Sequence, residues 1–113
     1  DIAIFYTENG IPFKYEPEIM LPGLDKPINT DFVIYIKELD NCKFHEHIGM
    51  KDSADYLRNV KIKYSNYTGA GLVPEHDIIF THDKDGVPFD IRYLETKLNN
   101  AIYGTLICHE FDA

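Results

Sequence analysis

Two carboxylates stand where they could share a divalent cation. Asp31 opens the apolar segment 31–36, and Glu46 lies near the far end of the segment 42–48. If these segments pair as an antiparallel hairpin around a turn at residues 38–41, the start of one strand lies beside the end of the other. Asp31 and Glu46 would then lie roughly opposite each other. Two acids held together in an apolar setting repel each other unless a metal neutralises them. Oxygen ligands of this kind suit Mg²⁺, whereas the alternative is that both acids are solvated strand ends.

A third acid, Glu16, lies in a segment that we expect to run beside the strand of Asp31. Glu16 could be an additional acid around the metal or could support one of the ligands. Alternation places Glu18 on the same face of that strand, so the pattern does not single out Glu16.

Two histidines flank Glu46 in the same expected strand. Because His45 and His47 alternate with Glu46, both rings should face away from it. An H-x-H pair can bind Zn²⁺ or another transition metal, but a third ligand is needed and none is spaced to suggest itself. The alternative is that both rings pack against a helix or face solvent.

The elements that must position these residues follow from the periodicity of the apolar side chains. The expected helices span residues 2–8, 52–68 and 88–103, and the expected strands span 11–20, 31–36, 42–48 and 77–81. Residues 21–29 predict a turn, and Pro17 predicts that the first strand is an edge strand or is interrupted there. The order is helix, three strands, helix, strand and a further C-terminal helix. It predicts an α/β fold with a mixed four-stranded sheet and helices on both faces.

Apolar stripes indicate which helix faces should be buried. In the 52–68 helix, which Asp52 or Ser53 can cap, the stripe consists of Ala54, Leu57, Val60, Ile62 and Tyr64. In the 88–103 helix it consists of Ile91, Leu94, Leu98 and Ile102. Gly104 is expected to end this helix, which leaves residues 104–113 as a small strand or a disordered end.

Length and composition limit the class of protein. The 113 residues, 44% of them apolar, are expected to form one globular domain over residues 1–113. The apolar pattern is already running at the first residues, which suggests a fragment of a longer protein. No apolar run approaches the roughly 20 residues that span a bilayer, and no signal peptide opens the chain. We therefore expect a cytoplasmic location and no membrane partner.

The charge bears on any interaction with nucleic acid. The 19 acidic and 11 basic residues give a net charge of −8, which argues against a free-standing DNA binder because phosphate contacts dominate such binding. The most basic stretch, residues 58–63, contains Arg58 and Lys61, the candidates for contacting DNA. The tyrosines around it are Tyr56, Tyr64 and Tyr67. They could stack on bases, although tyrosines at this spacing are also typical of packing.

These features resemble the PD-(D/E)XK, or restriction-endonuclease-like, nuclease superfamily, whose core runs helix, three-stranded meander, helix, strand. There, an acid begins the second strand and a (D/E)-x-K motif lies in the third, which are the positions of Asp31 and Glu46. Residues 46–49 (EHIG) are similar to the E-H-x-G motif of a bacterial subgroup whose domains are often joined to helicase-like proteins. The matching segments are 10–13 (GIPF), 15–17 (YEP), 31–32 (DF) and 46–50 (EHIGM), within residues 2–100.

The resemblance implies an endonuclease that uses Mg²⁺ or Mn²⁺ to hydrolyse DNA phosphodiester bonds. It implies that Asp31, Glu46 and the main-chain carbonyl of His47 hold the metal, and that the His47 ring could contact the substrate. Many nucleases of this type cut both strands as dimers, so a homodimer is a further partner that the resemblance allows.

Three departures from the superfamily pattern bear on activity. Thr30 replaces the usual proline, and the acid of the first helix would fall before residue 1. Ile48 stands at the position of the motif lysine, which normally orients the attacking water and stabilises developing charge. Some members supply this lysine from the following helix, where Lys63 is the first candidate here and Lys61 the second. The alternative for both lysines is a solvated position on the helix.

Three functions are compatible with these residues. The leading hypothesis is a metal-dependent DNA endonuclease with Asp31, Glu46 and Lys63 as its catalytic residues. The alternative is a catalytically weak or inactive nuclease-fold interaction module attached to a helicase-like polypeptide, which Ile48 and the net acidity favour. A transition-metal protein that uses His45 and His47 is a third hypothesis.

Overall fold

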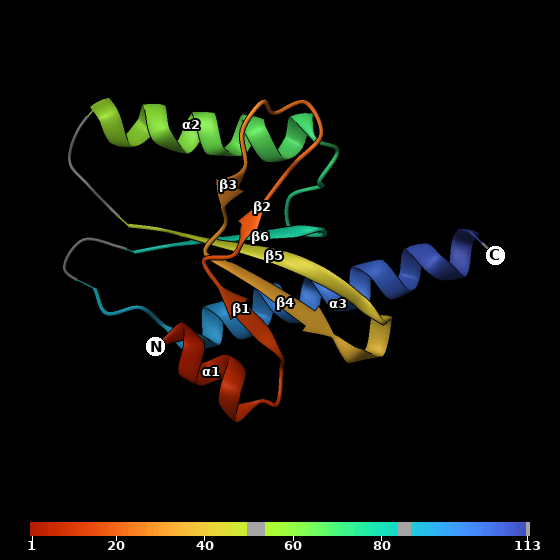
Figure 1. The fold of residues 1–113 in the computed structure, drawn as a ribbon. Helices are drawn as coiled ribbons and strands as arrows, with labels where there is room; N and C mark the ends of the chain where they lie inside the picture. The colour runs from red at the N-terminus through yellow and green to blue at the C-terminus, as the bar shows by residue number, and fades with distance from the viewer. Residues whose placement is uncertain (50–53, 84–86, 113) are drawn as a thin grey trace.

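The computed structural model describes residues 1–49, 54–83 and 87–112 (Figure 1). Its main sheet contains β1 (Phe13–Tyr15), β4 (Phe32–Ile36), β5 (Asn41–Ile48) and β6 (Ile78–His82), in the spatial order β1-β4-β5-β6. The described helices are α1 (Ile2–Glu8), α2 (Ala54–Gly69) and α3 (Ile91–Asp112). In Figure 1, α2 lies on one side of the sheet, and α1 and α3 lie on the other. The predicted α/β fold with a mixed four-stranded sheet is therefore confirmed.

Strand pairing follows the predicted meander and crossover. β1 pairs antiparallel with β4, β4 pairs antiparallel with β5, and β5 pairs parallel with β6. A parallel neighbour needs a long connection, which α2 provides between β5 and β6. In the β4–β5 pair, Phe32 lies opposite His45, so the next position outward brings Asp31 level with Glu46.

The two faces of the sheet bury different side chains. The cluster towards α1 and α3 includes the strand residues Phe32, Ile34, Ile36 and Ile79. The cluster towards α2 includes Tyr67, Ile78, Phe44 and Phe80. Because side chains alternate along a strand, β5 turns Glu46 towards α2 and turns His45 and His47 towards the opposite face.

The first extended segment is interrupted, as Pro17 predicts. β1 ends at Tyr15, and Glu16 adopts a left-handed φ of 51°. β2 (Glu18–Ile19) then pairs with β3 (Ile28–Asn29) in a separate two-stranded ribbon. The prediction of a simple turn over residues 21–29 is therefore wrong at the end of that segment, where β3 lies.

The connection between β4 and β5 is a short helical turn. It contains the 3-10 helix η1 (Lys37–Leu39), followed by Asp40 at a φ of 46°. Aspartate tolerates this left-handed conformation better than most residues. The hydroxyl of Tyr35 donates to Asp40 Oδ1 at 2.7 Å, which ties the turn to β4.

The buried face of α2 differs from the predicted apolar stripe. Three stripe residues are exposed, by 69% for Leu57, 51% for Ile62 and 47% for Tyr64. The helix instead buries Tyr67, which shares a helix face with Lys63 because the two are four residues apart. This face of α2 meets the carboxylate of Glu46 on the sheet, so Lys63 and Tyr67 are turned towards the sheet in place of the apolar stripe. The expected caps Asp52 and Ser53 lie outside the described residues.

The last helix is longer than the sequence predicts. Leu94 and Leu98 are buried as expected, but α3 continues through Gly104 to Asp112. The expectation that residues 104–113 form a strand or a disordered end is therefore wrong up to residue 112. The buried Lys43 donates to Thr105 Oγ1 at 2.9 Å, and this contact holds the helix to the sheet just beyond the glycine. None of the helices in the described ranges has the length and apolar character needed to cross a membrane.

Candidate active site

Asp31 and Glu46 are joined by hydrogen bonds between their two strands. The main-chain N–H of Asp31 donates to Glu46 Oε1 at 2.9 Å. The main-chain N–H of His47 donates to Asp31 Oδ2 at 2.8 Å. Each carboxylate is thus held by the backbone of the other strand, and the predicted juxtaposition of the two acids is confirmed.

Glu46 is a buried carboxylate that α2 partly neutralises. The residue is 1% exposed, and the hydroxyl of Tyr67 donates to its Oε1 at 2.9 Å. Lys63 Nζ forms an ion pair with Oε2 at 3.1 Å, although no hydrogen bond of normal geometry reaches that oxygen. The structure therefore brings Lys63 to the acids, while the Lys63 side chain remains 48% exposed and open to solvent on its other side.

The electrostatics of the pair favour a cation. Burial raises the pKa of Asp31, and the nearby charge of Glu46 raises it further, against the opposing effects of the His47 N–H and of Lys63. Burial likewise raises the pKa of the Tyr67 hydroxyl, which keeps it a hydrogen-bond donor to Glu46. Two acids in this environment are unfavourable when both are ionised, so a divalent cation would stabilise them.

The donor set fits a cation that prefers oxygen and retains waters. Asp31 and Glu46 offer carboxylate oxygens, and Glu46 Oε2 is a buried oxygen without a hydrogen bond. Within the described ranges, no three His, Cys, Asp or Glu side chains are grouped so that they could hold a metal. Two carboxylates completed by waters would be a set typical of Mg²⁺ rather than of a closed protein cage.

The Glu16 side chain takes no part in the hydrogen bonds that join Asp31 and Glu46. Glu16 is exposed, and its side chain interacts with the hydroxyl of Tyr15, whose pKa it raises. Its main chain contacts the site through a hydrogen bond from the Glu16 N–H to the Asp31 carbonyl at 2.8 Å. Because β1 ends at Tyr15 and Glu16 has a left-handed φ, the alternation expected for its side chain does not extend to this position.

The two histidines belong to a hydrogen-bonded chain on the opposite face of β5. His45 Nδ1 lies 2.7 Å from the Tyr6 hydroxyl, and His45 Nε2 lies 2.7 Å from Thr81 Oγ1. His47 Nδ1 lies 2.7 Å from the same Thr81 Oγ1, and His47 Nε2 lies 2.9 Å from Asp83 Oδ1. Burial lowers the pKa of His45 to about 3, so its ring is neutral. All four ring nitrogens have hydrogen-bonding partners, and this leaves the hypothesis of a transition-metal site without free ligands.

The predicted DNA-contacting residues lie apart from the acids. Arg58 and Lys61 are exposed on α2. Lys61 and Lys63 are two residues apart, which places them on different sides of the helix. Lys63 is therefore the lysine that reaches Glu46, whereas Lys61 points along the solvent side.

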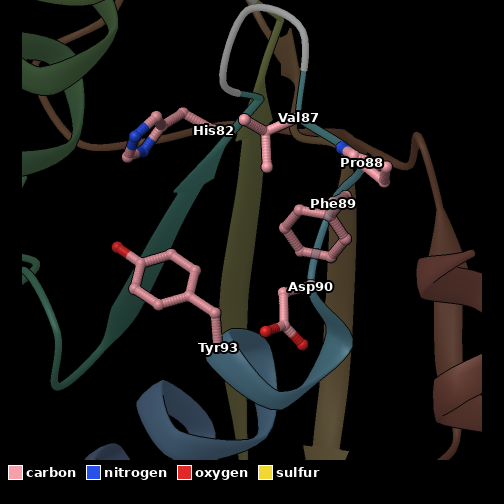
Figure 2. A pocket seen from close by; sticks show the side chains of 6 residues that line it. All are labelled: His82, Val87, Pro88, Phe89, Asp90 and Tyr93. Atoms are coloured by element: carbon pink, nitrogen blue, oxygen red, sulfur yellow. The ribbon is translucent and has the colours of Figure 1, made fainter.

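One pocket opens beside Asp31, and a second pocket shares one lining residue with it. A pocket of about 530 Å³ is lined by residues that include Asp31, His47 and Phe89. A second pocket of about 390 Å³, shown in Figure 2, is lined by His82, Val87, Pro88, Phe89, Asp90 and Tyr93. Phe89 lines both pockets, and its ring contacts the His47 ring edge-on at 5.0 Å. A substrate that reached Asp31 through the first pocket would therefore lie next to an aromatic wall.

Sequence reasoning missed three residues that hold the site. Tyr67 is buried, as the packing alternative predicts, but its contact with Glu46 was not predicted, although its spacing of four from Lys63 places both on one helix face. Thr81 lies opposite His47 in the β5–β6 pair, and Asp83 follows directly after β6. Their polar side chains at the end of an apolar strand were the available signal.

The Tyr67 contact predicts a measurable loss of stability. Tyr67→Phe removes a hydrogen bond to a buried charge, and we expect it to lower the free energy of unfolding by about 1.5–3 kcal/mol. Chemical denaturation measures this, with Tyr64→Phe, on the half-exposed tyrosine one turn earlier, as the control. Equal stabilities of the two variants would mean that the Tyr67 hydroxyl does not stabilise Glu46.

Comparisons of this chain with protein-family models, with curated proteins and with solved structures found no match.

Proposed function

We propose that this chain is a metal-dependent nuclease domain with a restriction-endonuclease-like core that hydrolyses DNA phosphodiester bonds. The observation that carries the proposal is the level pair of Asp31 and Glu46 with Lys63 ion-paired to Glu46. The order of α1, the β1–β4–β5 meander, α2 and β6 also agrees with the core that the resemblance implies. A cytoplasmic location and attachment to a helicase-like polypeptide are parts of the same proposal.

The metal-binding residues would be Asp31, Glu46 and the main-chain carbonyl of His47. When bound, Mg²⁺ or Mn²⁺ supplies a water of lowered pKa and stabilises charge on the leaving oxygen. Asp31 lines the 530 Å³ pocket and is thus reachable by a phosphate, whereas Glu46 is deeply buried. Lys63 holds a positive charge beside Glu46 and takes the role of the lysine that Ile48 replaces.

Contacts with DNA would come chiefly from surfaces outside the Asp31–Glu46 site. Arg58 and Lys61 on the exposed side of α2 can contact phosphates, and the His47 ring lines the pocket next to Asp31. The net charge of −8 limits how tightly this chain alone can hold a polyanion. We therefore assign DNA affinity mainly to partner domains and assign the chemistry to this one.

One observation favours the alternative of an inactive interaction module. Glu46 is 1% exposed, and protein groups already approach both of its carboxylate oxygens. A buried acid neutralised by Tyr67 and Lys63 would be stable without a metal. The affinity for a divalent cation decides between the two functions.

Calorimetric titration of Mn²⁺ tests the proposed site without DNA. The wild type should bind Mn²⁺, and Glu46→Gln should abolish detectable binding because a neutral amide is a poor ligand for a hard cation. Glu18→Gln is the matched control, since Glu18 is exposed on the separate β2–β3 ribbon. A folded wild type that does not bind Mn²⁺ would support the interaction module instead.

A further inference from the structure

A series of hydrogen-bonded side chains, on the face of β5 opposite to Glu46, links the protein interior to the candidate active site. It runs Tyr6, His45, Thr81, His47 and Asp83, with each consecutive pair 2.7–2.9 Å apart. Its inner members Tyr6, His45 and Thr81 are fully buried, whereas the Asp83 side chain is 49% exposed. The His47 main chain also donates to Asp31. His47, the member before Asp83, therefore lies one hydrogen bond from a proposed metal ligand.

When His47 is neutral and Asp83 is ionised, the available protons allow one direction for these hydrogen bonds. An ionised Asp83 only accepts, so a neutral His47 must carry its proton on Nε2 and must accept from Thr81 at Nδ1. Thr81 then accepts from His45 Nε2–H, and His45 Nδ1 accepts from the hydroxyl of Tyr6. In the reverse direction, His47 Nε2 would face Asp83 as a second acceptor. The Tyr6 proton would also lose His45, the hydrogen-bond partner that the described residues give it.

We propose that Asp83 is a positioning residue that acts through His47 on Asp31. By accepting the Nε2 proton, Asp83 fixes the tautomer and the orientation of the His47 ring, which Thr81 holds from the other side. The His47 main chain is thereby kept where its N–H donates to Asp31 Oδ2. That this positioning serves a metal ligand rests on the proposed function. The direction of the hydrogen bonds from Tyr6 to Asp83 does not depend on that function.

The main chain around His47 supports this role. The Asp83 N–H donates to the Ile48 carbonyl at 3.1 Å, so Asp83 is tied to β5 by its backbone as well as by its side chain. The Phe89 ring packs against the His47 ring at 5.0 Å. The His47 ring is thus held by Thr81, Asp83 and Phe89. Removal of the Asp83 carboxylate releases the end of the ring that faces solvent.

Nitrogen-15 NMR of the histidine rings tests the direction without metal or DNA. In the wild type at neutral pH, His45 and His47 should both be Nε2–H tautomers. Asp83→Ala should give His47 a mixture of tautomers and should speed hydrogen exchange of its main-chain N–H about tenfold, because a charge-assisted tether is lost. Asp90→Ala, which removes a carboxylate of similar exposure (50%) outside the chain, should change neither quantity.

A second pair of variants tests the buried hydroxyl. Thr81→Val should disturb the tautomers of both histidines, and Thr81→Ser should restore them, since serine keeps the hydroxyl and valine keeps the shape. If the valine variant does not fold, the measurements on Asp83→Ala alone test the proposal. A wild-type His47 in the Nδ1–H form would overturn the proposal, as would unchanged exchange of its N–H in Asp83→Ala. Failure of the wild type to bind Mn²⁺ would overturn the proposed function but would leave these two results standing.

Discussion

Asp31→Asn should slow DNA cleavage by about a thousandfold or more, since charge stabilisation by a metal contributes several kcal/mol to catalysis. The asparagine carbonyl oxygen can still accept the hydrogen bond from the His47 N–H, so the fold should persist. The measurement is cleavage of labelled single-stranded and double-stranded DNA in Mn²⁺, with the wild type as reference. Asp25→Asn, which changes an exposed loop carboxylate, is the matched control.

The same substitution should not lower stability at neutral pH. Because burial and Glu46 raise the pKa of Asp31 above 3.8, its ionised form costs the folded state free energy. The stabilising effect of the native carboxyl is present below the unfolded pKa and is lost as pH rises through the folded value. Asp31→Asn should therefore match or exceed the wild type in Tm at pH 7. Retained cleavage in this folded variant would remove Asp31 from the active site.

Lys63→Met should reduce cleavage by about a hundredfold, the usual cost of removing one group that stabilises developing charge. Mn²⁺ affinity should be kept or increased, because Lys63 and the metal both neutralise Glu46. Stability should fall by roughly 1–2 kcal/mol, less than for a fully buried pair because the lysine is half exposed. Rates with saturating Mn²⁺, together with calorimetry, separate these three effects.

Lys61→Met is the control for the lysine on the solvent side of the same helix. If Lys61 contacts DNA, its substitution should weaken substrate binding and leave the rate at saturating substrate unchanged. Equal rates at saturating substrate for the two methionine variants would show that Lys63 only balances the charge of Glu46.

The strands were predictable because their side chains carry the pattern of a buried sheet. β4 is apolar and largely β-branched, and its antiparallel pairing with β5 places Asp31 beside Glu46. β2 falls within the predicted strand over residues 11–20, but β3 and its pairing with β2 were not predicted, because two-residue strands leave no periodicity to detect. Gly104 was taken as a helix end, but the buried contacts around Thr105 outweigh the roughly 1 kcal/mol that an internal glycine costs a helix.

Only the part of the site that lies within one hairpin was predictable from the sequence. Asp31 and Glu46 belong to one hairpin, whose register the sequence pattern indicates. Tyr67, Thr81 and Asp83 join the site through contacts between residues 21 to 36 positions apart, from α2 and from β6 and the residue after it. Which face of α2 turns inward depends on the buried carboxylate that it meets, so the apolar stripe pointed to the wrong face.

The opposed faces of β5 constrain how this sequence can evolve. Substitutions can change one face at a time, since Glu46 serves the carboxylate pair while His45 and His47 serve the chain that ends at Asp83. A single-residue insertion or deletion inside the strand before Glu46 would exchange the two faces, because side chains alternate with a period of two. Such a change would expel the acid from its site and bury it among the partners of the histidines. Divergent descendants of this chain should therefore vary in length in the turn at Lys37–Leu39 or in the loops, and should keep the spacing from residue 41 to residue 47 fixed.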